Sequence, residues 1–244
     1  NAKLTGRVYF KDEVMWLGLS GSGASFTFDG TKLVLKLKGD NIAVGENPID
    51  YARIAVYVDG KRVVDEMINC AEKEVTVIDR TESAQSVVEI IKLSESPMSA
   101  VGIEAFAEGS AEALPENPLK IEFIGDSITC GYGVDDEDEN HQFTTATEDV
   151  TKAYAYKTAK ALDAEYSMFS ASGYGIVSGY TEGDEPISEQ TIPQFYCSYG
   201  FSRGNFAGTA PQDIPWDFSK YIPQIIVINL GTNDDSYCRD YKDR

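Results

Sequence analysis

Two stretches of the sequence end in the same way, and they constrain the fold more than any other feature. Residues 120–124 alternate charged and apolar side chains before entering an apolar pair, and residues 224–230 are a nearly continuous apolar run. Both are predicted to be β-strands that enter a core. A glycine follows each strand, in Gly125-Asp126-Ser127 and in Gly231-Thr232-Asn233. A glycine there allows a sharp turn, which presents the next polar side chain at the end of the strand.

A third strand is predicted at residues 164–169, and the small-residue turn 170–175 follows it. In open α/β sheets, ligands bind outside the carboxyl ends of the strands. We therefore expect Ser127, Gly173 and Asn233 to gather at one edge of a parallel sheet. The residues around Ser127 alone leave an alternative open, namely that Asp126-Ser127 only caps a helix.

The three blocks Gly125-Asp126-Ser127-Ile128-Thr129, Ser172-Gly173 and Gly231-Thr232-Asn233-Asp234 occur in an order that resembles the SGNH (GDSL-type) hydrolases. The resemblance implies a nucleophilic serine, Ser127, that forms a covalent acyl-enzyme, which water then hydrolyses. It also implies an oxyanion hole made by the backbone N–H groups of Ser127 and Gly173 and by the side-chain amide of Asn233. No cofactor is expected. The two acidic residues of these blocks, Asp126 and Asp234, are interpreted as holding the turns together rather than as taking part in the chemistry.

One part of this machinery is missing from the sequence. The superfamily supplies its general base as a His from a block near the carboxyl terminus, often with an Asp three residues before it. The only histidine here is His141, at the end of the acidic run 135–141, and that position matches no catalytic block. We therefore expect the base to lie in a carboxyl-terminal part that residues 1–244 do not include. The acidic run lacks the spaced pattern of a calcium loop and is predicted to be a solvated surface loop.

The amino-terminal part of the chain has short runs of β-forming residues and no useful helical period before about residue 107. Asp29-Gly30 and Asp59-Gly60 separate pairs of these runs and predict hairpin turns. Residues 1–108 are therefore predicted to form an all-β, jelly-roll-like sandwich domain.

The second half of the chain is predicted to be the hydrolase domain. Residues 109–118 contain two prolines and are predicted to be a linker. Residues 119–244 are then an α/β SGNH-type domain, a parallel sheet with helices on both faces, incomplete at its carboxyl terminus. Residues 150–162 are predicted to be a helix, with Glu148-Asp149 favouring its dipole. Residues 179–221 have no steady period; their aromatic side chains either stack on sugars or, as we favour, pack the segment against the domain.

A β-sandwich followed by an SGNH domain resembles carbohydrate esterase family 2, which removes acetyl groups from plant cell-wall polysaccharides. The strand at residues 53–58 and the region 144–161 add to this resemblance, which covers nearly the whole chain. It implies an acetylated oligo- or polysaccharide substrate of the xylan or glucomannan type. Two alternatives stay open: a non-catalytic carbohydrate-binding module on the same fold, or an SGNH esterase for another small acyl ester.

Composition excludes some partners. A net charge of -19 argues against nucleic acid and against anionic membrane surfaces, since phosphates need Lys and Arg. No apolar run is long enough to span a membrane. The four cysteines (Cys70, Cys130, Cys197 and Cys238) form no CxxC pair, and with a single histidine no metal site is expected. Free thiols are favoured over disulfides.

The chain begins at Asn1 with no apolar signal region, so any targeting segment is expected to have been removed or never to have existed. An extracellular location is expected from the resemblance, with a cytoplasmic location as the alternative.

Overall fold

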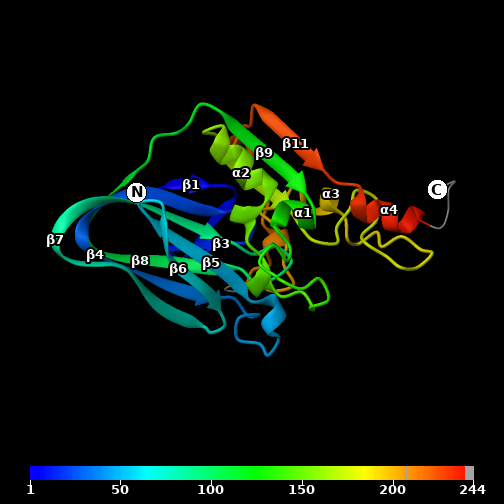
Figure 1. Cartoon of the computed structure of the whole chain (residues 1–244), viewed down its shortest axis with the longest axis horizontal. Helices are drawn as coiled ribbons and strands as arrows, with labels where there is room; N and C mark the ends of the chain where they lie inside the picture. The colour runs from blue at the N-terminus through cyan, green and yellow to red at the C-terminus, as the bar shows by residue number, and fades with distance from the viewer. Residues whose placement is uncertain (207, 240–244) are drawn as a thin grey trace.

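The computed structural model describes residues 1–206 and 208–239. The first eight strands are β1 (Lys3–Thr5), β2 (Val8–Lys11), β3 (Val14–Leu17), β4 (Gly23–Gly39), β5 (Ala52–Val58), β6 (Lys61–Ile68), β7 (Glu72–Lys92) and β8 (Val101–Ala113). They form one antiparallel sheet in the order β2-β3-β8-β4-β7-β5-β6, with β1 paired to β4. We call residues 3–113 the antiparallel unit. The long strands β4 and β7 bend together at the far left of Figure 1, so the sheet curls over its own core.

The core of the antiparallel unit follows the two-residue period of its strands. Leu33, Leu35 and Leu37 of β4 are fully buried, whereas the alternate residues Val34, Lys36 and Lys38 are partly exposed. Alternation of this kind places one side of a strand on the core and the other toward solvent. The curled sheet therefore encloses a single apolar cluster that includes Phe28 and Ile54.

One of the two predicted hairpin turns is correct. Asp59 and Gly60 both have positive φ angles and join β5 to β6, as an Asp-Gly hairpin requires. The prediction at Asp29-Gly30 was wrong, because β4 continues through these residues with a register shift just after Gly30. A Cβ on Gly30 would lie 2.3 Å from the Glu108 carbonyl oxygen, so this glycine permits close contact with β8 rather than a turn.

The second part of the chain holds a three-stranded parallel sheet, in the order β10-β9-β11. Its strands are β9 (Lys120–Gly125), β10 (Glu165–Ser170) and β11 (Ile225–Asn229). Its helices are α1 (Ser127–Cys130), α2 (Tyr154–Ala161), α3 (Ile192–Phe195) and α4 (Thr232–Cys238). Single 3-10 turns occur here at Thr145–Thr147, Val150–Lys152, Pro211–Asp213 and Phe218–Lys220, and in the first part of the chain at Pro48–Asp50. We call residues 120–239 the parallel unit. Figure 1 shows β9 and β11 side by side, leading to α1 and α4.

Two predicted boundaries differ from the structure. The strand β8 runs to Ala113, so residues 109–113 are strand and not linker, because they pair with residues 26–30 of β4. The helix predicted over 150–162 begins only at Tyr154 and packs through Ala155 and Ala159, while Leu162 is exposed. Glu148 and Asp149 are fully buried and so do not form an exposed first helical turn.

The two units share buried contacts over a wide surface. Ile91 and Leu93, from the end of β7 and the loop after it, pack in one cluster with Phe123 of β9 and Ala155 of α2. Arg7, which is fully buried, donates hydrogen bonds to the carbonyl oxygens of Tyr196 and Ser198 at 2.6 and 2.5 Å. The relative position of the units is therefore fixed by both apolar packing and buried hydrogen bonds.

Most aromatic side chains of residues 179–221 pack against the molecule, as favoured above. Phe195 and Phe201 stack with their ring centroids 4.4 Å apart, and Tyr199 and Phe206 are buried beside Trp16. Only some, such as Tyr180, are exposed. Cys70, Cys130 and Cys197 are free thiols. In the described part of the chain, no helix combines the length and the apolar character needed to cross a bilayer.

Candidate active site

The three strands of the parallel sheet end in register. Gly125 at the end of β9 pairs with Ser170 of β10 on one side and with Asn229 of β11 on the other. Because the strands are parallel, the segments that follow them leave from the same edge of the sheet. Ser127, Gly173 and Asn233 belong to these three segments. The structure thus brings together the residues that the sequence analysis selected.

Ser127 is the first residue of α1, immediately after the turn that ends β9. The Asp126 carboxylate accepts a hydrogen bond from the Ile128 N–H at 3.0 Å, so Asp126 is the helix cap and Ser127 is not. A Cβ on Gly125 would lie 2.0 Å from Thr129 Oγ1, which explains the need for glycine at this turn. Ser127 is half-buried, and none of the described residues forms a hydrogen bond with its hydroxyl group.

Gly173 lies in the turn after β10 with a φ of +80°, a conformation that favours glycine. Its carbonyl oxygen accepts a hydrogen bond from the Tyr180 N–H at 2.8 Å. Its own N–H has no partner among the described residues, and the glycine is only half-buried, so this N–H can be reached from outside. An unpaired N–H at the edge of the sheet is a donor available to a bound group.

Asn233 is in the first turn of α4 and is 7% exposed. Its side-chain nitrogen donates to the carbonyl oxygen of Tyr174 at 2.8 Å. This bond ties α4 to the residue that follows Gly173. An amide group has two N–H donors, so one remains after this bond is formed.

Asp234 holds the next part of the same turn, as predicted for this residue. One carboxylate oxygen accepts hydrogen bonds from the backbone N–H groups of Ile176, Val177 and Ser178 at 3.0, 2.7 and 3.1 Å. Partial burial alone would raise the pKa of Asp234, but these three donors together hold it below its ordinary value. The carboxylate is therefore a structural anion at the carboxyl edge of the sheet.

His141 is not buried in the site. It is 64% exposed on its side chain, its Nδ1 atom lies 2.8 Å from Asp136, and its Nε2 atom lies 3.8 Å from Asp138. The loop itself faces solvent at residues 137–142, as predicted. Asp135 and Asp136 are only partly exposed, and Asp135 pairs with Arg53 of the antiparallel unit at 2.9 Å.

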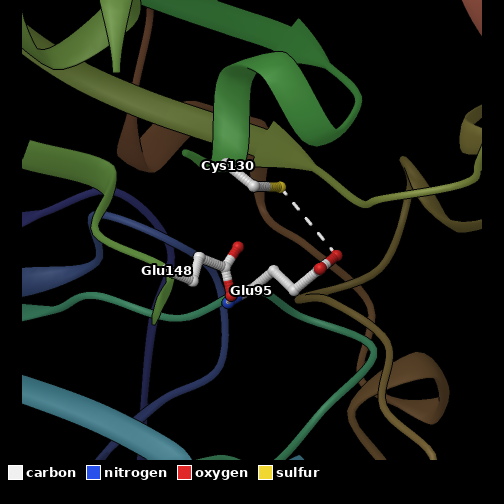
Figure 2. A group of neighbouring side chains, drawn as sticks. All are labelled: Glu95, Cys130 and Glu148. Atoms are coloured by element: carbon white, nitrogen blue, oxygen red, sulfur yellow. Dashed lines mark hydrogen bonds between the residues drawn. The ribbon is translucent and has the colours of Figure 1, made fainter. Parts of the chain in front are cut away.

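A buried polar group that the sequence did not indicate contacts the turn that contains Gly173. Figure 2 shows Glu95, Cys130 and Glu148 turned toward one another from three separate segments, with a hydrogen bond of 3.9 Å from Cys130 to Glu95. All three are fully buried. Glu95 also accepts a hydrogen bond from the Ser172 N–H at 2.6 Å. No sequence signal identifies this group, because an isolated Glu in a loop is usually exposed.

Each of these three side chains offers one atom that could bind a metal ion, and the three atoms lie within 4.8 Å of one another. Among the described residues, no other group of three or more His, Cys, Asp or Glu side chains comes this close together. A buried ammonium group, that of Lys92, interacts electrostatically with all three. The pocket therefore already contains a cation.

Comparisons with known proteins agree with the resemblance found in the sequence. Residues 4–118 match the family model "Carbohydrate esterase 2 N-terminal". The chain is 33% identical over 218 residues to the cellulase/esterase CelE of Acetivibrio thermocellus, covering 88% of this chain and 24% of that protein. It is 29% identical over 239 residues to an acetylxylan esterase/glucomannan deacetylase of Cellvibrio japonicus, covering 95% of this chain and 61% of that protein. This chain thus spans less than two thirds of either relative.

The fold also has a solved counterpart. A family two carbohydrate esterase from Clostridium thermocellum, in complex with cellohexaose, superposes with a TM-score of 0.78 at 26% identity, over 100% of this chain and 75% of that one. Residues 4–118 thus match the amino-terminal part of carbohydrate esterases of family 2, and the whole chain is similar to members of that family in sequence and fold.

Proposed function

We propose that this chain is part of a serine esterase that removes O-acetyl groups from a plant cell-wall polysaccharide of the xylan or glucomannan type. The observation that carries the proposal is the common register of Gly125, Ser170 and Asn229, from which the three candidate catalytic segments follow. The names of the two curated relatives, an esterase and an acetylxylan esterase/glucomannan deacetylase, support the reaction class and the kind of substrate. The strongly acidic chain suits a neutral substrate.

In the proposed mechanism, the Ser127 hydroxyl oxygen attacks the carbonyl carbon of the acetyl group. The general base takes the Ser127 proton and passes it to the leaving sugar oxygen, the acetyl group remains on Ser127, and water then releases acetate and restores the hydroxyl group. The N–H groups of Ser127 and Gly173 and the free N–H of the Asn233 amide would donate to the oxyanion. Each such donor is worth roughly 3 kcal/mol in the transition state.

We propose that the general base is a histidine outside residues 1–244. His141 is a poor candidate because its side chain is 64% exposed and, among the described residues, no hydrogen bond joins it to Ser127. The sheet gives further support. Ile225, Ile226 and Ile228 of the edge strand β11 are all exposed, although such an apolar strand is normally covered. Additional chain packed against β11 would bury them.

The finer architecture belongs to the same proposal. We infer a jelly-roll-like amino-terminal domain that ends with β8 at residue 113, a junction over residues 114–118, and a hydrolase domain from residue 119 with helices on both faces of its parallel sheet. Within the described residues, α2 packs on one face through Ala155, and Ile192 of α3 packs with Ile124 in a separate cluster. A polymeric substrate suggests that the protein works outside the cell.

A second candidate is a non-catalytic carbohydrate-binding protein on this fold. One observation favours it: Tyr132, five residues after Ser127, is an exposed ring stacked on Phe143 with the centroids 4.0 Å apart. A rigid exposed aromatic ring of this kind suits stacking on a sugar. Such a protein would bind oligosaccharides and release no acetate.

The decisive experiment compares Ser127→Ala with His141→Ala in the full-length protein, using p-nitrophenyl acetate and acetylated xylan or glucomannan. We expect Ser127→Ala to reduce hydrolysis to background with the fold intact by circular dichroism, because the nucleophile is lost. His141→Ala should retain normal activity. Near-normal hydrolysis by Ser127→Ala would remove this serine as the nucleophile. An inactive wild-type protein that binds oligosaccharides would favour the second candidate.

A further inference from the structure

The loop between β7 and β8, residues 93–100, is buried along its whole length and reaches the parallel unit. We propose that through this loop the antiparallel unit supplies a positioning residue to the active site: Glu95 holds the Ser172 amide and thereby fixes the direction of the Gly173 N–H in the oxyanion hole. This inference rests on the proposed esterase function. It gives the amino-terminal half of the chain a part in the reaction beyond any role in binding carbohydrate.

The turn after β10 is held at three consecutive residues by three different partners. Glu95 accepts from the Ser172 N–H at 2.6 Å, Tyr180 donates to the Gly173 carbonyl oxygen at 2.8 Å, and Asn233 donates to the Tyr174 carbonyl oxygen at 2.8 Å. The Gly173 N–H lies between the first two of these contacts. Since glycine at a positive φ is otherwise free to rotate, the contacts on each side set where its N–H points. Of the three partners, only Glu95 comes from the antiparallel unit.

Glu95 is itself held rigidly. Its backbone N–H donates to the Glu148 carboxyl group at 3.0 Å, and its carbonyl oxygen accepts from the Lys92 ammonium at 3.0 Å. The next residue, Ser96, donates from its hydroxyl group to the Phe201 carbonyl oxygen at 2.6 Å. A side chain locked by packing and by surrounding hydrogen bonds can fix a neighbouring group to within a fraction of an ångström.

The charges in the pocket allow Glu95 to be a strong acceptor. Burial raises the pKa of both Glu95 and Glu148, most strongly that of Glu148, and burial lowers the pKa of Lys92 to about 8. Each buried carboxyl group disfavours ionisation of the other, while the nearby Lys92 ammonium favours a carboxylate. One oxygen of each carboxyl group has no hydrogen-bond partner. In its ionised form, Glu95 forms a charge-assisted hydrogen bond with the Ser172 N–H.

Three substitutions in the full-length enzyme separate positioning from general support of the fold. Glu95→Asp keeps the charge but shortens the reach by one methylene, so the bond to Ser172 is lost. Glu95→Gln keeps the reach and an acceptor oxygen but loses the charge. Glu148→Gln is the matched control, since Glu148 belongs to the same buried group without touching the turn. Activity on p-nitrophenyl acetate and hydrogen exchange of the Ser172 amide are measured for each, with thermal unfolding to confirm folding.

We expect Glu95→Asp to lower kcat about tenfold or more, to leave KM within about threefold, and to speed Ser172 exchange about tenfold. Glu95→Gln should restore most of kcat, and Glu148→Gln should leave Ser172 exchange near the wild-type rate. Unchanged kcat and exchange in Glu95→Asp would overturn the inference, as would equal losses in all three variants. If Glu95→Asp does not fold, Glu95→Ala is measured in its place. A wild-type rate of Ser172 exchange and a wild-type kcat in that variant would also overturn the inference. If the wild-type protein hydrolyses no ester, the proposed function fails, while the exchange rates still test whether Glu95 holds the amide.

Discussion

Removing the Asp234 carboxylate should loosen the turn that follows Gly173. In Asp234→Ala the backbone N–H groups of residues 176–178 lose their common acceptor. A hydrogen bond to a charged group is worth about 1.5–3 kcal/mol when buried. Here Ile176 is 48% and Val177 67% exposed, so water can replace part of what is lost. We therefore expect the free energy of unfolding to fall by about 2 kcal/mol at pH 7 rather than by the sum of three buried bonds.

The effect should depend on pH in a defined direction. The pKa of Asp234 is lower in the folded protein than its ordinary value, because the three N–H donors outweigh burial. A carboxyl group of this kind stabilises the fold above its unfolded pKa, about 3.9, and loses that contribution as the pH falls through its lower folded pKa. The difference between wild type and Asp234→Ala should therefore be largest at pH 7 and should shrink below about pH 4.

Urea unfolding followed by circular dichroism at pH 7, 4 and 3 measures this difference. Asp235→Ala is the control, since Asp235 is the exposed neighbour in the same helical turn and should change stability by less than about 1 kcal/mol. A gap of under about 0.5 kcal/mol at pH 7 would mean that water replaces the carboxylate fully. A gap of the same size at pH 3 as at pH 7 would show that the charge of Asp234 is not what holds the turn.

Two further predictions concern the site and the contact between the units. Asn233→Ala should lower kcat about a hundredfold and change KM by less than about threefold, because the lost bond forms mainly in the transition state. Steady-state kinetics with p-nitrophenyl acetate test this, and an unchanged kcat would exclude Asn233 from the oxyanion hole. Arg7→Met should lower the free energy of unfolding by about 3–5 kcal/mol, since it leaves the Glu122 carboxylate and two buried carbonyl oxygens without their cation. Urea unfolding measures the loss, and a value under about 1 kcal/mol would contradict a locking role for Arg7.

The sequence by itself determined the features that depend on neighbouring residues. The strands β9 and β11 have apolar runs that end in glycine, and the rule that parallel strands end at a common edge led to Ser127, Gly173 and Asn233. The hairpin at Asp59-Gly60 follows from the φ angles that those two residues tolerate. The strands, their common edge and this hairpin are confirmed, because backbone preference and period act over a few residues, whereas the roles of Ser127, Gly173 and Asn233 stay a prediction.

Only the tertiary structure decided the features that depend on residues far apart in the chain. The Asp29-Gly30 pair looks locally like a turn, but its pairing with both β7 and β8 keeps β4 extended. Glu95 and Glu148 look like ordinary surface acids, yet packing of the two units buries both. The Glu95 contact with Ser172 joins residues 77 positions apart. Burial is a property of the assembled fold, so no local pattern could have revealed the acidic pair behind the candidate oxyanion hole.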